Sequence, residues 1–171
     1  IMNDIDMSEV CGQAKGNWTP IGSTAAPFKG RVIGNGHVIS NLYIRNTKAY
    51  QGLFGAIGDG AYITGITLDN TCNIRGGSYV GGIAGGSNIG GFVTITNCGN
   101  EGTIYATQQN GGGIIGCSNG SHATFIIKDC YNTGVISGNL ENGAISGWAG
   151  NNATIENCYN TARVGGDDGK S

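Results

Sequence analysis

Carboxylate side chains are the first candidates for chemistry in this chain, but its 11 acidic residues are scattered. A glycoside hydrolase needs two carboxylates that face each other across the scissile bond, and a calcium-dependent lyase needs several oxygen ligands around one ion. Asp4 and Asp6 alternate as they would along a strand. Asp59 and Asp69 have no carboxylate partner at the same repeat position, and the acidic pair at 167–168 lies in the terminal stretch. The sequence therefore predicts no catalytic residues, no cofactor and no metal site.

Cysteine is the reactive residue with the most regular spacing. Of the six cysteines, Cys98, Cys130 and Cys158 follow an Asn or Asp at the same position of successive repeats, and Thr71-Cys72-Asn73 gives a slipped copy. On neighbouring strands their Cα atoms would be close enough for a disulfide, but three cysteines in one file cannot all pair. We expect buried free thiols that pack as small apolar side chains, with a disulfide as the alternative. No Cys-x-x-Cys or Cys/His spacing indicates zinc.

The two histidines and two other cysteines do not extend this set. His37 lies in a turn that leads into a strand, where a structural role is expected, and His122 lies in a loop, where a solvated side chain is expected. Neither has a Ser and an Asp at a spacing that indicates a catalytic triad. Cys11 and Cys117 lie outside the repeated position, so each is a candidate for an exposed thiol.

The elements that must position these side chains are defined by a glycine repeat. The string glycine–apolar–any–glycine occurs three times with a degenerate fourth copy, and the closing glycines are 30, 31 and 31 residues apart. A fixed period of roughly 20–50 residues is the signature of a solenoid, in which each coil buries its apolar face only against its neighbours. The repeat positions are Gly52, Leu53, Gly55, Gly82, Ile83, Gly85, Gly113, Ile114, Gly116, Ile145 and Gly147.

A strand pattern runs in phase with the glycine strings. Five segments alternate apolar with mostly polar residues and end in Asn or Asp, which is the period of a half-buried strand. Stacking them coil on coil predicts one interior file of Ile44, Leu68, Ile95, Ile127 and Ile155. A second predicted file holds Leu42, Ile66, Val93, Phe125 and Ala153. The closing residues predict a hydrogen-bonded corner ladder of Asn46, Asn70, Asn97, Asp129 and Asn157.

The outward positions of the same segments predict a solvated face. This register pairs Arg45 with Asp69, and Lys128 with Glu156, across neighbouring strands. Each such pair adds a few tenths to about 1 kcal/mol. The outward threonines would form one file interrupted by an isoleucine, as the ordinary strand preference of threonine explains; its members are Thr67, Thr94, Ile126 and Thr154.

Composition limits the function classes. Glycine makes up 34 of 171 residues and charged residues 12%, against about 7% and about 25% in an average domain. A net charge of −2 without a basic patch gives no support for a nucleic-acid partner. No apolar run approaches the roughly 18 residues of a membrane span, so this segment is not expected to insert into a membrane. Few charges and many Asn, Thr, Ser and Gly favour a β-rich extracellular protein.

The predicted fold is all-β: a right-handed parallel β-helix, or β-solenoid, of about five coils. Residues 1–27 break the repeat and are expected to form an irregular first coil or cap. Residues 28–164 are expected to hold the solenoid repeats, and residues 165–171 a tail or linker. Because exposed coil ends need caps and the chain starts at Ile1 rather than Met, we expect it to be part of a longer protein.

Several strings near the start of the chain resemble a known family. The strings Trp18–Gly22, Gly34–Leu42 and Gly52-Leu53-Phe54-Gly55 are similar to the opening of GLUG-motif β-solenoids, which are repeats of bacterial surface and secreted proteins. The last string matches the motif fully, whereas later copies keep the glycines and vary the middle. The resemblance implies a right-handed parallel β-helix with adhesin-like use, and it supplies no catalytic residues. Such repeats also accompany some metallopeptidases as non-catalytic segments, and this chain has no His-Glu-x-x-His.

The expected function is that of a non-enzymatic module of a secreted or cell-surface bacterial protein, which adheres to host glycans or to matrix or surface proteins. The ligand would bind on one lateral face or in the segments 86–91, 106–111 and 117–123. Two alternatives are a carbohydrate-active lyase or hydrolase on the same scaffold and a structural stalk without a ligand. Candidate aromatic residues for sugar stacking are Tyr50, Tyr62, Tyr79 and Tyr105.

Overall fold

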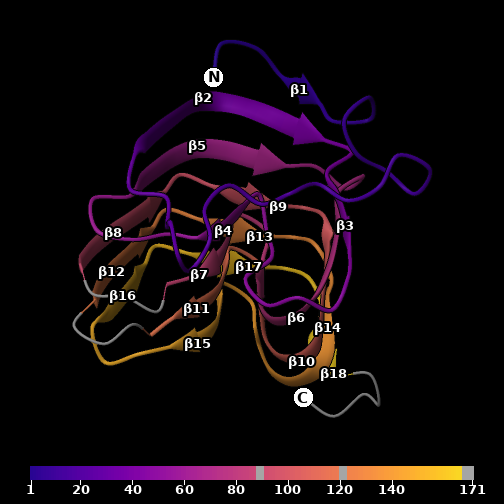
Figure 1. The fold of residues 1–171 in the computed structure, drawn as a ribbon. Helices are drawn as coiled ribbons and strands as arrows, with labels where there is room; N and C mark the ends of the chain where they lie inside the picture. The colour runs from indigo at the N-terminus through magenta and orange to yellow at the C-terminus, as the bar shows by residue number, and fades with distance from the viewer. Residues whose placement is uncertain (88–90, 120–122, 167–171) are drawn as a thin grey trace.

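The chain forms a parallel β-solenoid of about five turns in the computed structural model, which describes residues 1–87, 91–119 and 123–166. These residues include no helix, and every pair of named strands in the sheets is parallel. Figure 1 shows the coils stacked from β2 near the N-terminus to the last coil near the C-terminus. The predicted fold class is confirmed, because the strands stack in parallel coil on coil and the glycine strings return once per turn.

Three sheets run along the solenoid. The nine-stranded sheet contains β1 (Ile5–Asp6), β2 (Arg31–Ser40), β5 (Tyr62–Leu68), β8 (Gly91–Thr96), β9 (Gly99–Asn100), β12 (Ala123–Lys128), β13 (Tyr131–Asn132), β16 (Ala153–Glu156) and β17 (Tyr159–Asn160). The five-stranded sheet contains β3 (Tyr43–Arg45), β6 (Asn73–Gly81), β10 (Thr103–Gly112), β14 (Ile136–Gly143) and β18 (Val164–Gly166). The four-stranded sheet contains β4 (Phe54–Ala56), β7 (Ala84–Gly86), β11 (Ile115–Ser118) and β15 (Ser146–Ala149).

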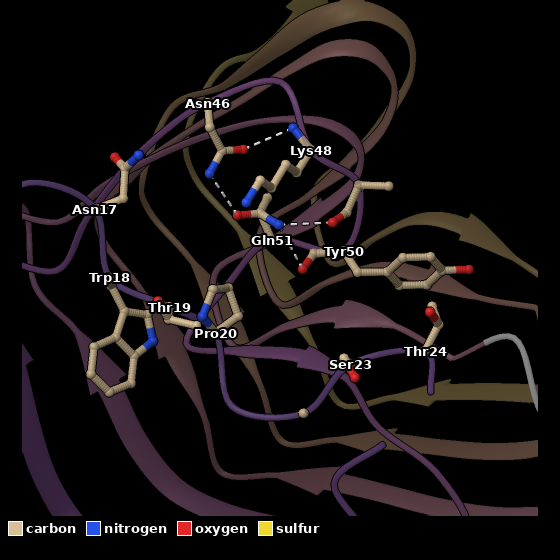
Figure 2. Close-up of a pocket in the computed structure, with 12 residues that line it drawn as sticks. Asn17, Trp18, Thr19, Pro20, Ser23, Thr24, Asn46, Lys48, Tyr50 and Gln51 are labelled. Atoms are coloured by element: carbon tan, nitrogen blue, oxygen red, sulfur yellow. Dashed lines mark hydrogen bonds between the residues drawn. The ribbon is translucent and has the colours of Figure 1, made fainter. Parts of the chain in front are cut away.

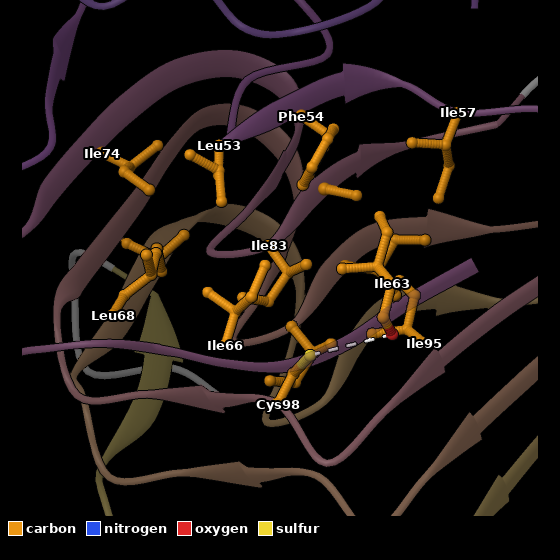
Figure 3. Packing of buried hydrophobic residues seen from close by; sticks show 14 of the residues in the cluster. Leu53, Phe54, Ile57, Ile63, Ile66, Leu68, Ile74, Ile83, Ile95 and Cys98 are labelled. Carbon is orange, nitrogen blue, oxygen red and sulfur yellow. Dashed lines mark hydrogen bonds between the residues drawn. The ribbon is translucent and has the colours of Figure 1, made fainter. Parts of the chain in front are cut away.

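Apolar files from the three sheets meet in a narrow core (Figure 3). In the nine-stranded sheet, one file joins Ile63, Ile95, Ile127 and Ile155. In the five-stranded sheet, a file joins Ile44, Ile74, Ile104 and Ile136. The glycine strings add Leu53, Ile83, Ile114 and Ile145, all buried.

The predicted interior files are therefore wrong in the first two coils. Leu68 lies opposite Asn100 rather than Ile95, and Ile44 belongs to the five-stranded sheet. Likewise Ile66 lies opposite His37, and the strand of Val93 pairs at Ala61 rather than at Ile66, because the Thr94 amide donates to the Ala61 oxygen. The segment 66–70 has the same alternating pattern as 93–97, so pattern alone could not reject the wrong register.

The ladder at the corner after residue 64 also differs from the prediction. Asn97, Asp129 and Asn157 occupy it with φ of 52°, 54° and 52°, and Asn157 Nδ2 donates to Asp129 Oδ1 at 3.1 Å. In the coil before, this place is taken by Gly65, with φ of 69°, rather than by Asn70. Glycine, Asn and Asp tolerate this left-handed backbone best, so the corner selects a conformation and not one side chain.

A second, buried amide ladder lies three residues further along. Asn100 Nδ2 donates to Asn132 Oδ1 at 2.8 Å, and Asn132 Nδ2 donates to Asn160 Oδ1 at 2.7 Å. Each amide also donates to the backbone oxygen two residues ahead, at 2.8 to 3.0 Å. Leu68 occupies the equivalent place in the coil before, so Asn100 Oδ1 has no donor among the described residues.

The glycine strings mark places where backbones of neighbouring coils touch. Their register is continuous, since Phe54 pairs with Ala84, Ala84 with Ile115 and Ile115 with Ser146. A Cβ at Gly113 would lie 2.3 Å from the oxygen of Ala144. A Cβ added to a closing glycine would meet the backbone of a bend in the preceding coil. The Cβ on Gly85 would lie 2.6 Å from Tyr50 Cα, and the Cβ on Gly116 would lie 2.4 Å from the Tyr79 carbonyl carbon.

The outward register confirms one of the two predicted charge pairs. Lys128 Nζ lies 3.3 Å from Glu156 Oε2. The pairing of Arg45 with Asp69 is wrong, because Arg45 lies opposite Arg75. Thr94 and Thr154 flank Ile126 in one file as expected, whereas Thr67 lies opposite Gly99 and belongs to another file.

Residues 1–27 lie over the first full coil. Strand β1 pairs with β2, and isolated bridges join Ile21 to Phe54 and Phe28 to Ile57. Trp18 Nε1 donates to the Leu53 oxygen at 3.0 Å. This segment therefore contributes both backbone pairing and an indole ring to the solenoid.

Replacing Gly85 with alanine should destabilise the protein by about 3 kcal/mol, or roughly 6–12 °C in melting temperature for a chain of this size. The new Cβ would lie 2.6 Å from Tyr50 Cα, so a backbone must shift. Thermal denaturation followed by circular dichroism measures the effect. Gly165→Ala is the control, because its Cβ would meet only a side-chain atom of Arg163 at 3.9 Å. Equal melting temperatures for both variants would contradict the close-approach argument.

Asn132→Ala should cost about 2–3 kcal/mol, because it removes the middle of a buried ladder and leaves the amide of Asn100 without its acceptor. Chemical denaturation gives the free energy of unfolding. Asn151→Ala, at an exposed turn position, should change it by less than about 0.5 kcal/mol. A loss at Asn132 no larger than that at Asn151 would show that the ladder does not stabilise the fold.

Candidate functional site

The three cysteines of the repeat lie in one file inside the nine-stranded sheet, and all six thiols are free. Cys98 and Cys130 are buried and Cys158 is half-buried. Each thiol donates to the backbone oxygen two residues before it, at 3.2 to 3.3 Å. The prediction that Cys11 and Cys117 are exposed thiols is wrong, since both side chains are buried.

Cys72 does not belong to this file. Its Sγ donates to the Ile39 oxygen at 3.3 Å at a different corner of the coil. Burial raises the pKa of the Cys72 thiol to about 12. A hydrogen bond with Cys98 and burial also raise the pKa of the Cys130 thiol well above its ordinary value. Because the thiolate is the nucleophile, these side chains remain neutral packing groups near pH 7.

The four aspartates singled out in the sequence each accept a hydrogen bond from a backbone amide; they are Asp4, Asp6, Asp59 and Asp69. Asp4 Oδ1 accepts from the Val38 amide at 2.9 Å and lies 3.0 Å from His37 Nδ1, and the backbone hydrogen bond is the main cause that lowers the Asp4 pKa. Asp59 Oδ1 accepts from the Phe92 amide at 2.9 Å. Within residues 1–87, 91–119 and 123–166, no three His, Cys, Asp or Glu side chains converge as metal ligands would. His122 and the acidic pair at 167–168 lie outside the described residues.

The four tyrosines proposed for sugar stacking are half-buried, and each has a ring contact. The Tyr50 and Tyr79 rings are 4.9 Å apart, the Arg31 guanidinium lies 4.7 Å from the Tyr62 ring, and that of Arg75 lies 4.5 Å from the Tyr105 ring. Tyr131 and Tyr159, which were not among the predicted aromatic residues, form a stacked pair with ring centroids 5.5 Å apart. The repeated string Cys-Tyr-Asn was the signal for it.

The segments expected to be ligand-binding loops are only partly described. Residues 106–111 are not a loop, because β10 continues through them with a bulge between Ala106 and Gln109. Of the other two segments, residues 88–90 and 120–122 lie outside the described part of the chain.

A pocket of about 320 Å³ lies where the first-coil segment 17–24 meets the bend at 46–51 (Figure 2). We call it the corner pocket. It is lined by Asn17, Trp18, Thr19, Pro20, Gly22, Ser23, Thr24, Asn46, Lys48, Ala49, Tyr50 and Gln51. In Figure 2, Asn46, Lys48 and Gln51 form one wall, and Pro20, Ser23 and Thr24 lie opposite them.

Side-chain amides fix the shape of the bend. Asn46 Nδ2 donates to Gln51 Oε1 at 3.0 Å, and Asn46 Oδ1 accepts from the Lys48 amide at 2.9 Å. Gln51 Nε2 donates to the Ala49 oxygen at 2.7 Å and to the Tyr50 oxygen at 3.0 Å. The prediction that Asn46 belongs to the corner ladder is wrong: it braces this wall, because β3 has already turned into the five-stranded sheet.

The opposite wall is held by the Asn17 side chain, which pairs with the backbone of Arg45 as a neighbouring strand would. Asn17 Oδ1 accepts from the Arg45 amide at 2.7 Å, and its Nδ2 donates to the Arg45 oxygen at 3.2 Å. The corner pocket therefore has a preformed backbone, braced by the amides of Asn17 and Gln51, and offers hydroxyls, one ammonium group, the half-buried Asn46 amide and two aromatic side chains. This set can hydrogen-bond and stack with a polar, ring-shaped ligand.

Comparison with known proteins finds one partial relative and no family. No family model matches the chain. A protein of Evansella cellulosilytica described as "Putative Gly-rich membrane protein" is 35% identical over 69 residues, which is 40% of this chain. The matched segment spans only 8% of that relative's length. No solved structure matches.

In the part of this chain that the structure describes, no helix has the length and apolar character needed to cross a membrane.

The melting temperature should fall as the pH rises from about 8 to about 10.5. The folded Cys72 thiol has a pKa of about 12, whereas an unfolded thiol titrates near 8.5. The unfolded chain thus loses this proton first, so the stabilisation from the neutral thiol is full below about pH 8.5 and is lost progressively as the pH rises toward about 12. Cys72→Ala should flatten this decline, and Thr71→Ala, which changes a neighbour that does not titrate, should leave it unchanged. A wild-type slope in Cys72→Ala would contradict the assignment.

Proposed function

We propose that this chain is a non-enzymatic binding module of a bacterial cell-surface or secreted protein and that it adheres to a glycan through the corner pocket. The observation that carries this proposal is the chemistry of the pocket: Lys48 and the half-buried amide of Asn46 face the hydroxyls of Ser23 and Thr24 across about 320 Å³, and the buried Gln51 holds their wall in place. Sugars present hydroxyl groups around a ring, and such a wall of mixed donors and acceptors is complementary to them.

The surroundings of the pocket support binding rather than catalysis. None of the described residues that line it is a carboxylate or a histidine, so these residues do not supply the pair of acids that glycosidic bond hydrolysis uses. Its walls are fixed by amide–backbone hydrogen bonds, which lowers the entropic cost of ordering them around a ligand. The low fraction of charged residues and the relative described as a membrane protein support a place at the cell surface.

Tyr50→Ala should weaken glycan binding by about tenfold or more, because it removes an aromatic wall of the corner pocket. The assay is a screen of the folded protein on arrays of host glycans and matrix proteins, followed by calorimetric titration of the best ligand. Tyr159→Ala is the matched control, since Tyr159 also has a tyrosine neighbour but lies in β17 at the far end of the solenoid.

A second variant guards against loss of folding in the first. Thr24 is exposed in the first-coil segment, so Thr24→Trp should fill the pocket without removing a core contact. Binding that survives both Tyr50→Ala and Thr24→Trp would place the ligand elsewhere. Absence of saturable binding to any glycan by the folded wild-type protein would overturn the proposal.

A further inference from the structure

The outer surface of the five-stranded sheet carries two arginines in adjacent strands. Burial fixes the orientation of the strands: Ile44, Ile74 and Ile104 are fully buried, so the residues on either side of them point outward. One outward file consists of Tyr43, Asn73 and Thr103, and the other of Arg45, Arg75 and Tyr105.

These six side chains and Gln13 line a pocket of about 360 Å³. We call it the sheet pocket. It shares no lining residue with the corner pocket, and none of the described residues that line it is a carboxylate, although the whole chain has a net charge of −2. The ion pairs found among the described residues join Lys15 to Glu9, His37 to Asp4 and Lys128 to Glu156, so they leave both arginines of the sheet pocket out.

The direct pairing of Arg45 with Arg75 is an unfavourable arrangement for the protein alone. Like charges placed opposite each other on neighbouring strands repel, and a bound anion would relieve that repulsion. The guanidinium of Arg75 stacks over the Tyr105 ring at 4.5 Å, which fixes its plane while leaving its edge for hydrogen bonding. A planar guanidinium held this way suits a carboxylate, which it can bind through two parallel hydrogen bonds.

The other lining groups indicate what the carboxylate is attached to. Tyr43 offers part of a ring for stacking, and Asn73, Thr103 and Gln13 offer an amide or a hydroxyl, which match the hydroxyl groups of a sugar. A nucleic acid fits less well, because its affinity depends on many cations along the phosphates and the sequence pI is near 5.5. We propose that the sheet pocket binds a carboxylated sugar of an acidic polysaccharide, with Arg45 and Arg75 holding the carboxylate.

This site lies on a different surface from the corner pocket, so either proposal can fail while the other stands.

A further arginine extends the same face of the five-stranded sheet. The Ile136 amide donates to the Arg163 oxygen, which places Arg163 in the outward file of Tyr43, Asn73 and Thr103, two strands beyond Thr103. A chain of acidic sugars that follows the solenoid axis would pass from the sheet pocket toward Arg163.

The test is calorimetric titration of the protein with oligomers of a uronic acid, with the same oligomers after reduction of their carboxylates to alcohols as the matched ligand control. Wild type should bind the acidic oligomers saturably and the reduced ones at least about tenfold more weakly. Arg75→Gln should lose about tenfold or more in affinity, and Arg75→Lys should recover only part of it, since lysine keeps the charge but not the two parallel hydrogen bonds.

Arg31→Gln is the protein control. Arg31 also stacks on a tyrosine, with its guanidinium 4.7 Å from the Tyr62 ring, but it lies on the nine-stranded sheet. It should change the affinity by less than about twofold. The proposal is overturned if wild type binds no oligouronate, if the reduced oligomer binds equally well, if Arg31→Gln loses as much as Arg75→Gln, or if DNA or sulfated oligosaccharides bind more tightly than the carboxylated ones.

Discussion

Close contact between the backbones of successive coils is the constraint on which the rest of this structure depends. Parallel strands must keep their hydrogen-bonding distance at every turn, and the bends between sheets must nest without side chains between them. At Gly85 and Gly116 a single added carbon would collide with the backbone of a bend in the preceding coil. The glycine strings therefore set the register, and every apolar file, amide ladder and outward face follows from it.

Burial in this fold comes from neighbouring coils and not from a globular centre. Ile63, Ile95 and Ile127 are 0% exposed, whereas Ile155, the next member of the same file, is 41% exposed in the last coil. The amide ladder shows the same dependence, since Asn100 and Asn132 are buried and Asn160 is exposed. Each coil is thus stabilised mainly by the coils on either side of it, as expected for a nearly one-dimensional repeat protein.

With the interior filled by repeated small and branched side chains, functional variation is restricted to the surface. The corner pocket uses departures from the repeat, namely the first-coil segment 17–24 and the bend at 46–51. The sheet pocket uses outward strand positions, where any side chain is compatible with the fold. Two surfaces with different polar groups can therefore coexist on one scaffold without disturbing its core.

The sequence by itself determined the fold class and the alignment of the glycine strings, because a fixed period and strict alternation leave few other structures. It also identified the file of Cys98, Cys130 and Cys158. It could not set the register of the second coil, because Gly65 and Asn70 both close plausible segments and only packing selects the glycine. Both pockets were likewise decided by tertiary structure. Their walls come from segments about 30 residues apart, and only the stacking of coils brings Asn17 to Arg45, and Arg45 to Arg75.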